Sequence, residues 1–388
     1  MVTMETANNA LKTFYLDAVT EALDKKANPL LAQIEQTTSD VVGKDVKKLV
    51  KLGMNGGISA GSETGELPAS SSETRVTFTS TLKNLYGTIQ ISDKAIRASA
   101  NNEGAFVNLL NDEMQGLIKS ARFNFGRMLF GDGTGKIGLI SNASGNVATL
   151  IDGTGLLEGL YVDFFSFDGT TALGRNFKIV SIDREANTMT VSGMKQLSDV
   201  VTGPAAVYLH DSRGYEITGL KAIFESPILY GVDTTANPML KPYNAIDVGE
   251  ISENIIQTAI DRIEENSGSR VNFIVCSWGV KRALAEYFRE QGVSLPSLSF
   301  EGGFNGLSFN GIPVVADRFC PKGVMYLLNT EDFKLHQLCD WKWLEGEDGK
   351  VLKQVPGKPV YTATLVKYAE LMCERPSGQG MISGITEA

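Results

Sequence analysis

Apolar residues recur at helical spacing over one long segment, residues 103–130. The apolar stripe consists of Phe106, Leu109, Leu110, Met114, Leu117, Ala121, Phe125, Met128 and Leu129. Such a stripe predicts an amphipathic helix with one buried face, and Asn101 or Asn102 can cap its start. At 1.5 Å per residue the helix would be about 40 Å long, and it would far exceed the usual mean of about 12 residues.

The first 50 residues show shorter runs with the same spacing. The first run contains Leu11, Phe14, Tyr15, Ala18, Val19, Ala22 and Leu23, and it stops at Asn28 and Pro29. Two further short helical runs are predicted at Leu30–Gln36 and Val41–Val50. The last run carries a basic face formed by Lys44, Lys47, Lys48 and Lys51. Simple solvation accounts for this face, and contact with a neighbouring subunit or with nucleic acid is the alternative.

Strict alternation of apolar and polar residues begins after a segment rich in Gly, Ser and Thr, residues 53–73, which we expect to be extended or mobile. The alternating apolar positions are Val76, Phe78 and Leu82 in one run and Leu85, Ile89 and Ile91 in the next. With Lys83 and Asn84 between the runs, the pattern predicts a two-stranded ribbon. Because an isolated ribbon is marginally stable in water, it should rest on the body of the protein or on a partner chain.

Short β-type runs replace the helical pattern in residues 138–211. They read NVATLI, YVDFFSF, FKIVSID, TMTVSG and AAVYLHD, and the third and fourth are joined by REAN as in a hairpin. Their regular spacing predicts a small closed barrel inserted into the chain.

An α/β pattern follows Tyr215. Helices are predicted from the stripe between Ile251 and Ile263, ending near Gly268, and from Val280 to Gln291, ending at Gly292. The buried strands are expected in VNFIVCS, GIPVVADRF and GVMYLLN, and a long final strand in PVYTATLVKYAELMCERPSG.

Composition and charge narrow the class of protein. The chain has 388 residues, is 43% hydrophobic and carries 45 acidic against 36 basic residues. A net charge of −9 argues against a protein whose main task is to wrap nucleic-acid phosphate. No apolar run approaches the roughly 20 residues of a membrane helix, and the N-terminus lacks the features of a secretion signal. We therefore expect synthesis in the cytoplasm and no membrane partner.

Candidate chemistry is sparse. The segment Leu129–Leu139, LFGDGTGKIGL, has only three residues between Gly131 and Gly135, and Ile137 stands where a phosphate-binding loop has a hydroxyl residue. We interpret it as a glycine-rich helix end with positive-φ residues. His210 and His336 lack partners at metal-ligand spacing.

The cysteines are expected to be reduced and without a catalytic role. Cys276, Cys320, Cys339 and Cys373 form no CxxC pair, which is typical of reduced thiols. Cys276 lies at a predicted strand-to-helix junction where a nucleophile can sit, but its apolar neighbours favour a buried structural thiol. The sequence thus predicts no catalytic residue, cofactor or metal.

The order of these segments resembles that of the major capsid proteins of tailed bacteriophages. The resemblance is carried by IQISDKAIRAS before the long helix, by AFVNLLNDEMQGLIKSARFNFGRML along it and by FGDGTGKIGLIS after it. It implies an α+β Hong Kong 97-type (HK97-like) capsid fold with an inserted β-barrel. The implied parts are an N-terminal arm (1–55), an extended loop (56–100), the spine helix of a peripheral domain (101–136), the barrel (137–212), further peripheral residues (213–244), an axial domain (245–355) and a C-terminal peripheral strand (356–388).

The same resemblance implies a structural protein without catalysis. It would assemble with itself through pentamers and hexamers into an icosahedral shell around double-stranded DNA, in a virion made in the host cytoplasm. About 100 residues precede the long helix, so we expect a separate scaffolding protein or none, besides a portal, and no covalent cross-links. The residues expected at subunit interfaces are Leu11, Phe14, Tyr15, Ala18, Val76, Phe78, Leu85 and Ile89.

Other functions stay open at this point. A shell of the encapsulin type, enclosing a cargo enzyme, would use the same fold. A nucleotide-dependent α/β enzyme built on GDGTGK belongs to a different class, and calorimetry with a nucleotide would reveal it. A surface adhesin that holds glycans with the barrel is a further alternative.

Overall fold

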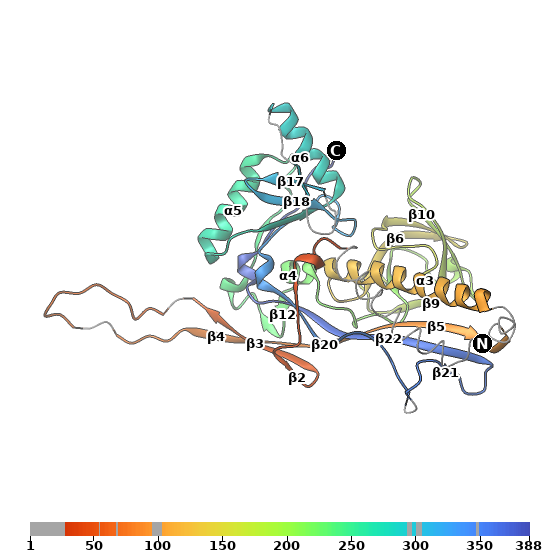
Figure 1. Ribbon diagram of the computed structural model, residues 1–388. Coiled ribbons are helices and arrows are strands. Elements are labelled where there is room, and N and C mark those ends of the chain that lie inside the picture. The colour runs from red at the N-terminus through yellow and green to blue at the C-terminus, as the bar shows by residue number, and fades with distance from the viewer. Residues whose placement is uncertain are drawn as a thin grey trace.

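The computed structural model describes residues 28–53, 55–66, 69–94, 103–292, 297–299, 305–346 and 349–388, in a mixed α+β arrangement. Figure 1 shows a long sheet with one helix lying along it, a β-barrel and an α/β unit on the helix side, and a thin ribbon that projects from the body. The predicted fold class is confirmed at this level.

Helix α3, Glu103–Phe130, has the predicted bounds. Its last two turns are buried against the rest of the subunit by Phe123, Phe125, Met128, Leu129 and Phe130. The ring of Phe125 meets that of Trp341 edge-on at 6.5 Å, which fixes the helix on the sheet below it.

The sheet under α3, here called the central sheet, combines distant parts of the chain. Its strands are β1 (Glu35–Thr37), β20 (Phe333–Trp343), β22 (Val360–Cys373), β21 (Lys353–Gln354) and β5 (Lys83–Ser92). Strand β22 pairs with β20 on one side and, on the other, with β5 from Lys83 opposite Ala369 to Ser92 opposite Val360. The long C-terminal strand was predicted correctly, and it is the middle of this sheet.

The ribbon is built from other strands than predicted. Strands β2 (Val41–Val42), β3 (Asp45–Leu52) and β4 (Thr74–Thr81) form a separate sheet in which β3 pairs with β4. The predicted pairing of the two alternating runs is wrong, because only Leu82 separates β4 from β5 and the chain passes there from one sheet to the next. The ribbon thus begins at Asp45 and not after residue 55.

The two short helices predicted before the ribbon are also wrong. Leu30–Gln36 contains a 3-10 turn, η1 (Leu31–Gln33), followed by β1, and Val41–Val50 falls in β2 and β3. In β3 the side chains alternate, so that Lys47, Leu49 and Lys51 are exposed while Val46 and Leu52 are buried. The lysine spacing of this segment fits a helical face, but its β-branched valines Val46 and Val50 favour the strand.

The inserted barrel is confirmed. Its strands are β6 (Lys136–Ser144), β7 (Val147–Asp152), β8 (Tyr161–Ser166), β9 (Ala172–Asp183), β10 (Thr188–Ser192) and β11 (Ala205–Leu209), closed in the order β10-β7-β6-β11-β8-β9. The predicted hairpin is the β9–β10 pair, with Asp183 opposite Thr188. Alternate residues such as Phe164, Ile179 and Met189 fill the interior, and η2 (Leu197–Asp199) lies before β11.

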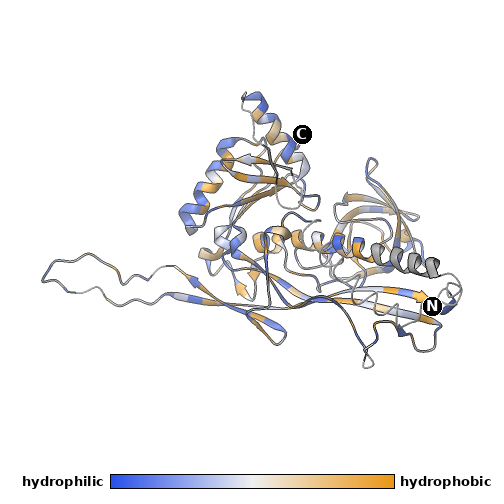
Figure 2. Ribbon diagram, in the orientation of Figure 1, coloured by the Kyte–Doolittle hydropathy of each residue, from blue (hydrophilic) through white to orange (hydrophobic). Residues whose placement is uncertain are grey.

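The α/β unit has a seven-stranded sheet with the order β14-β23-β19-β15-β18-β17-β16. These strands are β14 (Tyr243–Ala245), β23 (Gly380–Ile382), β19 (Met325–Leu328), β15 (Phe273–Cys276), β18 (Ile312–Ala316), β17 (Asn305–Phe309) and β16 (Ser297–Ser299). Helices α5 (Glu253–Ser267) and α6 (Trp278–Glu290) match the two predicted helices, and Gly268 ends α5 with φ +66°. Apolar residues follow the inner strands in Figure 2, and polar residues follow the outer faces of both helices.

The boundaries predicted for the axial domain need correction. Residues 333–343 and 353–354 belong to the central sheet as β20 and β21, although the prediction placed them in 245–355. Conversely, β23 lies in the α/β sheet, although 356–388 was expected to be peripheral. Both errors arise because each sheet is completed by a strand that returns from far along the chain.

Short elements connect the barrel to the α/β unit and close the remaining turns. They are α4 (Leu220–Glu225), β12 (Ile228–Leu229), β13 (Val232–Asp233), η3 (Pro238–Leu240), η4 (Thr330–Asp332) and η5 (Pro376–Gly378).

Candidate functional site: subunit contact surfaces

The glycine loop after α3 is a turn. Gly133 and Gly135 have φ values of +78° and +84°, and Asp132 accepts the Thr134 N–H at 2.9 Å. Lys136 is already the first residue of β6. The loop therefore joins α3 to the barrel, in agreement with the predicted turn, and the residue set of a nucleotide-binding loop is absent from it.

Three of the four cysteines are unsuited to nucleophilic chemistry. Cys276 is fully buried, and burial raises the pKa of its thiol to about 12. Burial also raises the pKa values of the Cys320 and Cys373 thiols well above the usual range. All four cysteines are free, and Cys339 is the one that is partly exposed. The structural interpretation of Cys276 is confirmed.

Each histidine has a hydrogen-bond partner, which for His336 is the Ser39 carbonyl oxygen, 3.0 Å from its Nδ1. His210 lies with its Nδ1 2.7 Å from the Asp163 carboxylate, which also accepts N–H groups from Asn176 and Asp211. These bonds join β8 to β9 and to the residues that follow β11. Asp163, His210 and Asp211 form the group of potential metal ligands found among the described residues. Sequence reasoning missed it, since 47 positions separate Asp163 from His210.

The predicted interface residues of the ribbon lie inside the subunit. Phe78, Leu85 and Ile89 are 0%, 6% and 4% exposed, and Val76 is partly buried beside them. The Phe78 ring packs on Tyr230 at 5.4 Å. The structure therefore gives these side chains a place in the subunit core. Leu11, Phe14, Tyr15 and Ala18 lie outside the described residues.

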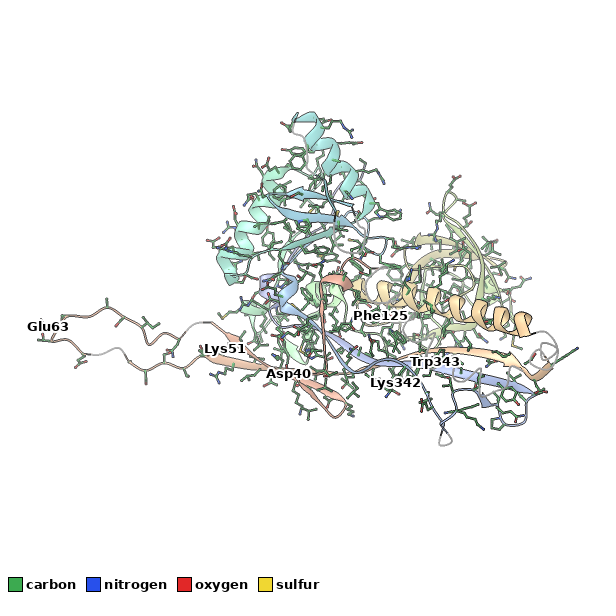
Figure 3. The ribbon with its side chains drawn as sticks, in the orientation of Figure 1. Asp40, Lys51, Glu63, Phe125, Lys342 and Trp343 are labelled. Carbon is green, nitrogen blue, oxygen red and sulfur yellow. The ribbon has the colours of Figure 1, made fainter. Side chains whose placement is uncertain are left out.

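The exposed surface of the ribbon lies on its opposite face. Lys47, Leu49 and Lys51 on β3 and Arg75 on β4 point outward, and Leu49 is 54% exposed. Glu73 lies 3.2 Å from Lys51 and 3.5 Å from Arg75. Figure 3 shows the ribbon running from Asp40 and Lys51 to Glu63 at its far end, well clear of the body. The predicted basic face grouped Lys44, Lys47, Lys48 and Lys51 on a helix, whereas in the strand Lys47 and Lys51 share their exposed face with Arg75 of β4.

The root of the ribbon is held by a polar network. Lys48 Nζ lies 2.9 Å from Asp40 and 3.1 Å from Glu374, and Lys334 lies 3.4 Å from Glu374. The hydrogen bond from Lys48 lowers the pKa of the Asp40 carboxyl, and the same bond raises the pKa of Lys48. The Tyr230 hydroxyl adds a second anchor, because it donates to Leu371 O and accepts the Cys373 N–H, both at 3.1 Å.

The comparisons with known proteins bear on the fold. We found no matching family model and no matching curated protein. The structure does match the capsid asymmetric unit of cyanophage A-1(L), with a TM-score of 0.57 and 10% identity, over 95% of this chain and 93% of the other. The chain has the Hong Kong 97-type capsid fold.

Two further matches have lower scores. The encapsulin SrpI of Synechococcus elongatus gives a TM-score of 0.47 at 9% identity over 93% of this chain and 89% of its own. The capsid of the Myoviridae phage XM1 gives 0.46 at 11% identity over 93% and 92%. The predicted names spine helix, extended loop and axial domain are kept below as labels for α3, for the ribbon of β3 and β4 and for the α/β unit. The search for membrane-crossing helices, made over the described residues, found none.

Proposed function

We propose that this chain is the major capsid protein of a tailed phage and closes, through pentamers and hexamers, into an icosahedral shell around double-stranded DNA. The observation that carries the proposal is the extended loop. Its distal residues are largely exposed, with Ile58 at 87%, and they pack against little of their own subunit. Such a loop gains stability when it lies on a neighbouring copy.

The exposed basic face of the loop suggests the kind of surface it meets. Lys47, Lys51 and Arg75 surround Leu49, whereas the whole chain carries a net charge of −9. An acidic surface on the neighbouring copy would complement this face and set the register of the contact. The arm stripe with Leu11, Phe14, Tyr15 and Ala18 remains a predicted second contact.

The proposed shell needs no active site. DNA would be held by confinement and non-specific contact, since a net acidic container does not bind phosphate tightly over its whole surface. A separate scaffolding protein and a portal are the proposed assembly partners, and assembly would take place in the host cytoplasm before the chain becomes part of the virion.

Negative-stain electron microscopy tests this function. The chain is purified alone and after expression with its neighbouring genes, and closed shells or rings of five and six are expected. A monodisperse small species under both conditions would contradict the proposal.

The contents of the particles separate a capsid from a nanocompartment. Nuclease-resistant DNA in particles from an infected host supports the capsid, whereas a co-purifying enzyme inside DNA-free shells supports an encapsulin-type compartment.

A further inference from the structure

A cavity of about 360 Å³ lies where the spine helix, the barrel and the axial domain meet. Its walls come from the end of α3, from β6 and the turn after β7, from α4 and from the axial segment 319–322. The volume is within the roughly 300–1,000 Å³ range of small-molecule sites. No part of the proposed shell function accounts for this cavity.

Basic side chains from four separate elements converge on it: Arg127, Lys136, Lys221 and Lys322. Arg127 is buried and is neutralised by Glu216, whose carboxylate accepts its Nη1–H at 2.9 Å. Lys136 and Lys322 form no ion pair with a described residue, and Lys221 reaches Glu225 only at 4.0 Å. Three lysines therefore line one cavity in a protein of net charge −9, and the same walls contain the carboxylates of Asp132 and Asp152.

The two carboxylates of the walls are engaged in their own turns. Asp132 accepts the Thr134 N–H at 2.9 Å, and Asp152 accepts the Thr154 N–H at 3.0 Å and its hydroxyl at 2.9 Å. These bonds orient the two carboxylates without removing their charge, so the three lysines exceed the two wall aspartates by one positive charge. Phe130, Phe319 and Pro321 form the apolar part of the walls.

A helix C-terminus also attracts cations, and α3 ends at this cavity. Arg127 already supplies a basic group in the last turn of α3. The helix end accordingly explains one cation here and leaves Lys136, Lys221 and Lys322 unexplained.

We propose that this cavity binds a phosphate group, either free or carried by a polynucleotide, through Lys136, Lys221 and Lys322. The glycine turn contributes Gly131 and Asp132 to the walls, but recognition comes from lysine side chains and not from a cradle of backbone amides. A bound phosphate connects the barrel to the axial domain and holds their relative orientation.

Calorimetry on the intact, unassembled chain tests the site with two probes, inorganic pyrophosphate and a short DNA duplex. Lys136→Gln and Lys322→Gln should each weaken binding about tenfold, as expected for loss of a charged contact. The matched control is Lys195→Gln, an exposed barrel lysine away from this cavity, which should bind as the parent does. Binding of pyrophosphate identifies free phosphate as sufficient, and binding of the duplex alone identifies a polynucleotide as the source.

The proposal is overturned if neither probe binds, or if Lys195→Gln weakens binding as much as the two cavity variants. Thermal unfolding without ligand provides the structural control: lysines that serve only the helix end would lower the melting temperature equally with and without pyrophosphate, and that outcome also overturns it. Because the assay uses unassembled subunits, its failure leaves the shell function untouched.

Discussion

Two buried acidic residues near the spine helix, Glu216 and Glu370, differ in their interaction partners. Glu216 is paired with Arg127, whereas Glu370 is fully buried, accepts the Thr218 N–H at 2.6 Å with one oxygen and has no described partner for the other. Burial raises the pKa of the Glu370 carboxyl to about 7. Both residues fasten the segment that leaves the barrel, one to α3 and the other to β22.

The pH dependence of stability follows from Glu370. Since its folded pKa of about 7 lies above the ordinary 4.5, the folded subunit binds this proton more tightly, and stability falls as the pH rises from 4.5 to 7. The loss is at most about 3 kcal/mol. Glu370→Gln should therefore be more stable than the parent at pH 8 and equal to it at pH 5, as measured by urea unfolding.

Asp317, whose pKa is raised by burial to about 6, adds a smaller dependence of the same sign to both proteins. The control is the exposed Glu158→Gln, which should follow the parent at both pH values. Stability curves for Glu370→Gln and the parent that run parallel from pH 5 to pH 8 would show that Glu370 is not the titrating group.

A pair of glycines on α3 gives a second test at this scale. A Cβ at Gly126 would lie 2.7 Å from the Phe319 ring and 2.9 Å from Asn28, whereas one at Gly116 would meet no described atom within 4 Å. Gly126→Ala should cost about 1–3 kcal/mol through overpacking, and Gly116→Ala should gain up to about 1 kcal/mol from helix propensity. Denaturant unfolding measures the change in the free energy of unfolding for both variants. Equal changes would show that Phe319 does not pack tightly against Gly126.

At the level of elements, the most regular patterns were predicted best. The bounds of α3 and the long strand β22 could be predicted because apolar periodicity is continuous over many residues. The helix predicted for residues 41–50 was wrong because the spacing of the lysines fits both a strand and a helical face. Only the pairing of β3 with β4 decides between the two. Partner choice is a non-local property, which explains the wrong pairing of β4 with β5.

The polar network at the loop root predicts the behaviour of Lys48. Lys48→Gln removes the cation between Asp40 and Glu374, and because the side chain is 26% exposed the cost should be modest, up to about 1 kcal/mol. We expect faster hydrogen exchange in β3 and β4 without global unfolding. Lys47→Gln, on the exposed face of the same strand, is the matched control and should exchange at the parental rate. Identical hydrogen-exchange rates of β3 and β4 in both variants would show that the polar network does not anchor the ribbon.

On the scale of the whole molecule, the extended loop should decide assembly. Replacing residues 54–72 by a two-residue Asn-Gly turn joins β3 to β4 directly, so the subunit should fold and yet form no closed shells. Sedimentation and electron microscopy measure the outcome. A control variant with a Gly-Ser loop of the original length shows whether the length of the loop or its side chains matter for assembly. Normal shells from the shortened variant would exclude the loop as an assembly contact.

The candidate contact surfaces were less accessible from sequence than the fold. Phe78, Leu85 and Ile89 were correctly recognised as apolar positions of strands, but their burial depends on Tyr230, α3 and β22, which sequence spacing does not bring together. The same holds for the cavity lysines, which lie at positions 136, 221 and 322. Alternation of apolar and polar residues identifies the apolar face of a strand, whereas the elements that pack on this face are determined by the tertiary structure.

Strand β23 has a consequence for synthesis on the ribosome. It pairs with β14 on one side and β19 on the other, and β14 has no other strand partner in this sheet. A nascent chain whose spine helix and extended loop have already left the exit tunnel still lacks Gly380–Ile382, so its axial sheet is open. If the proposed shell forms, a subunit becomes competent to join it only after this late strand has emerged from the ribosome.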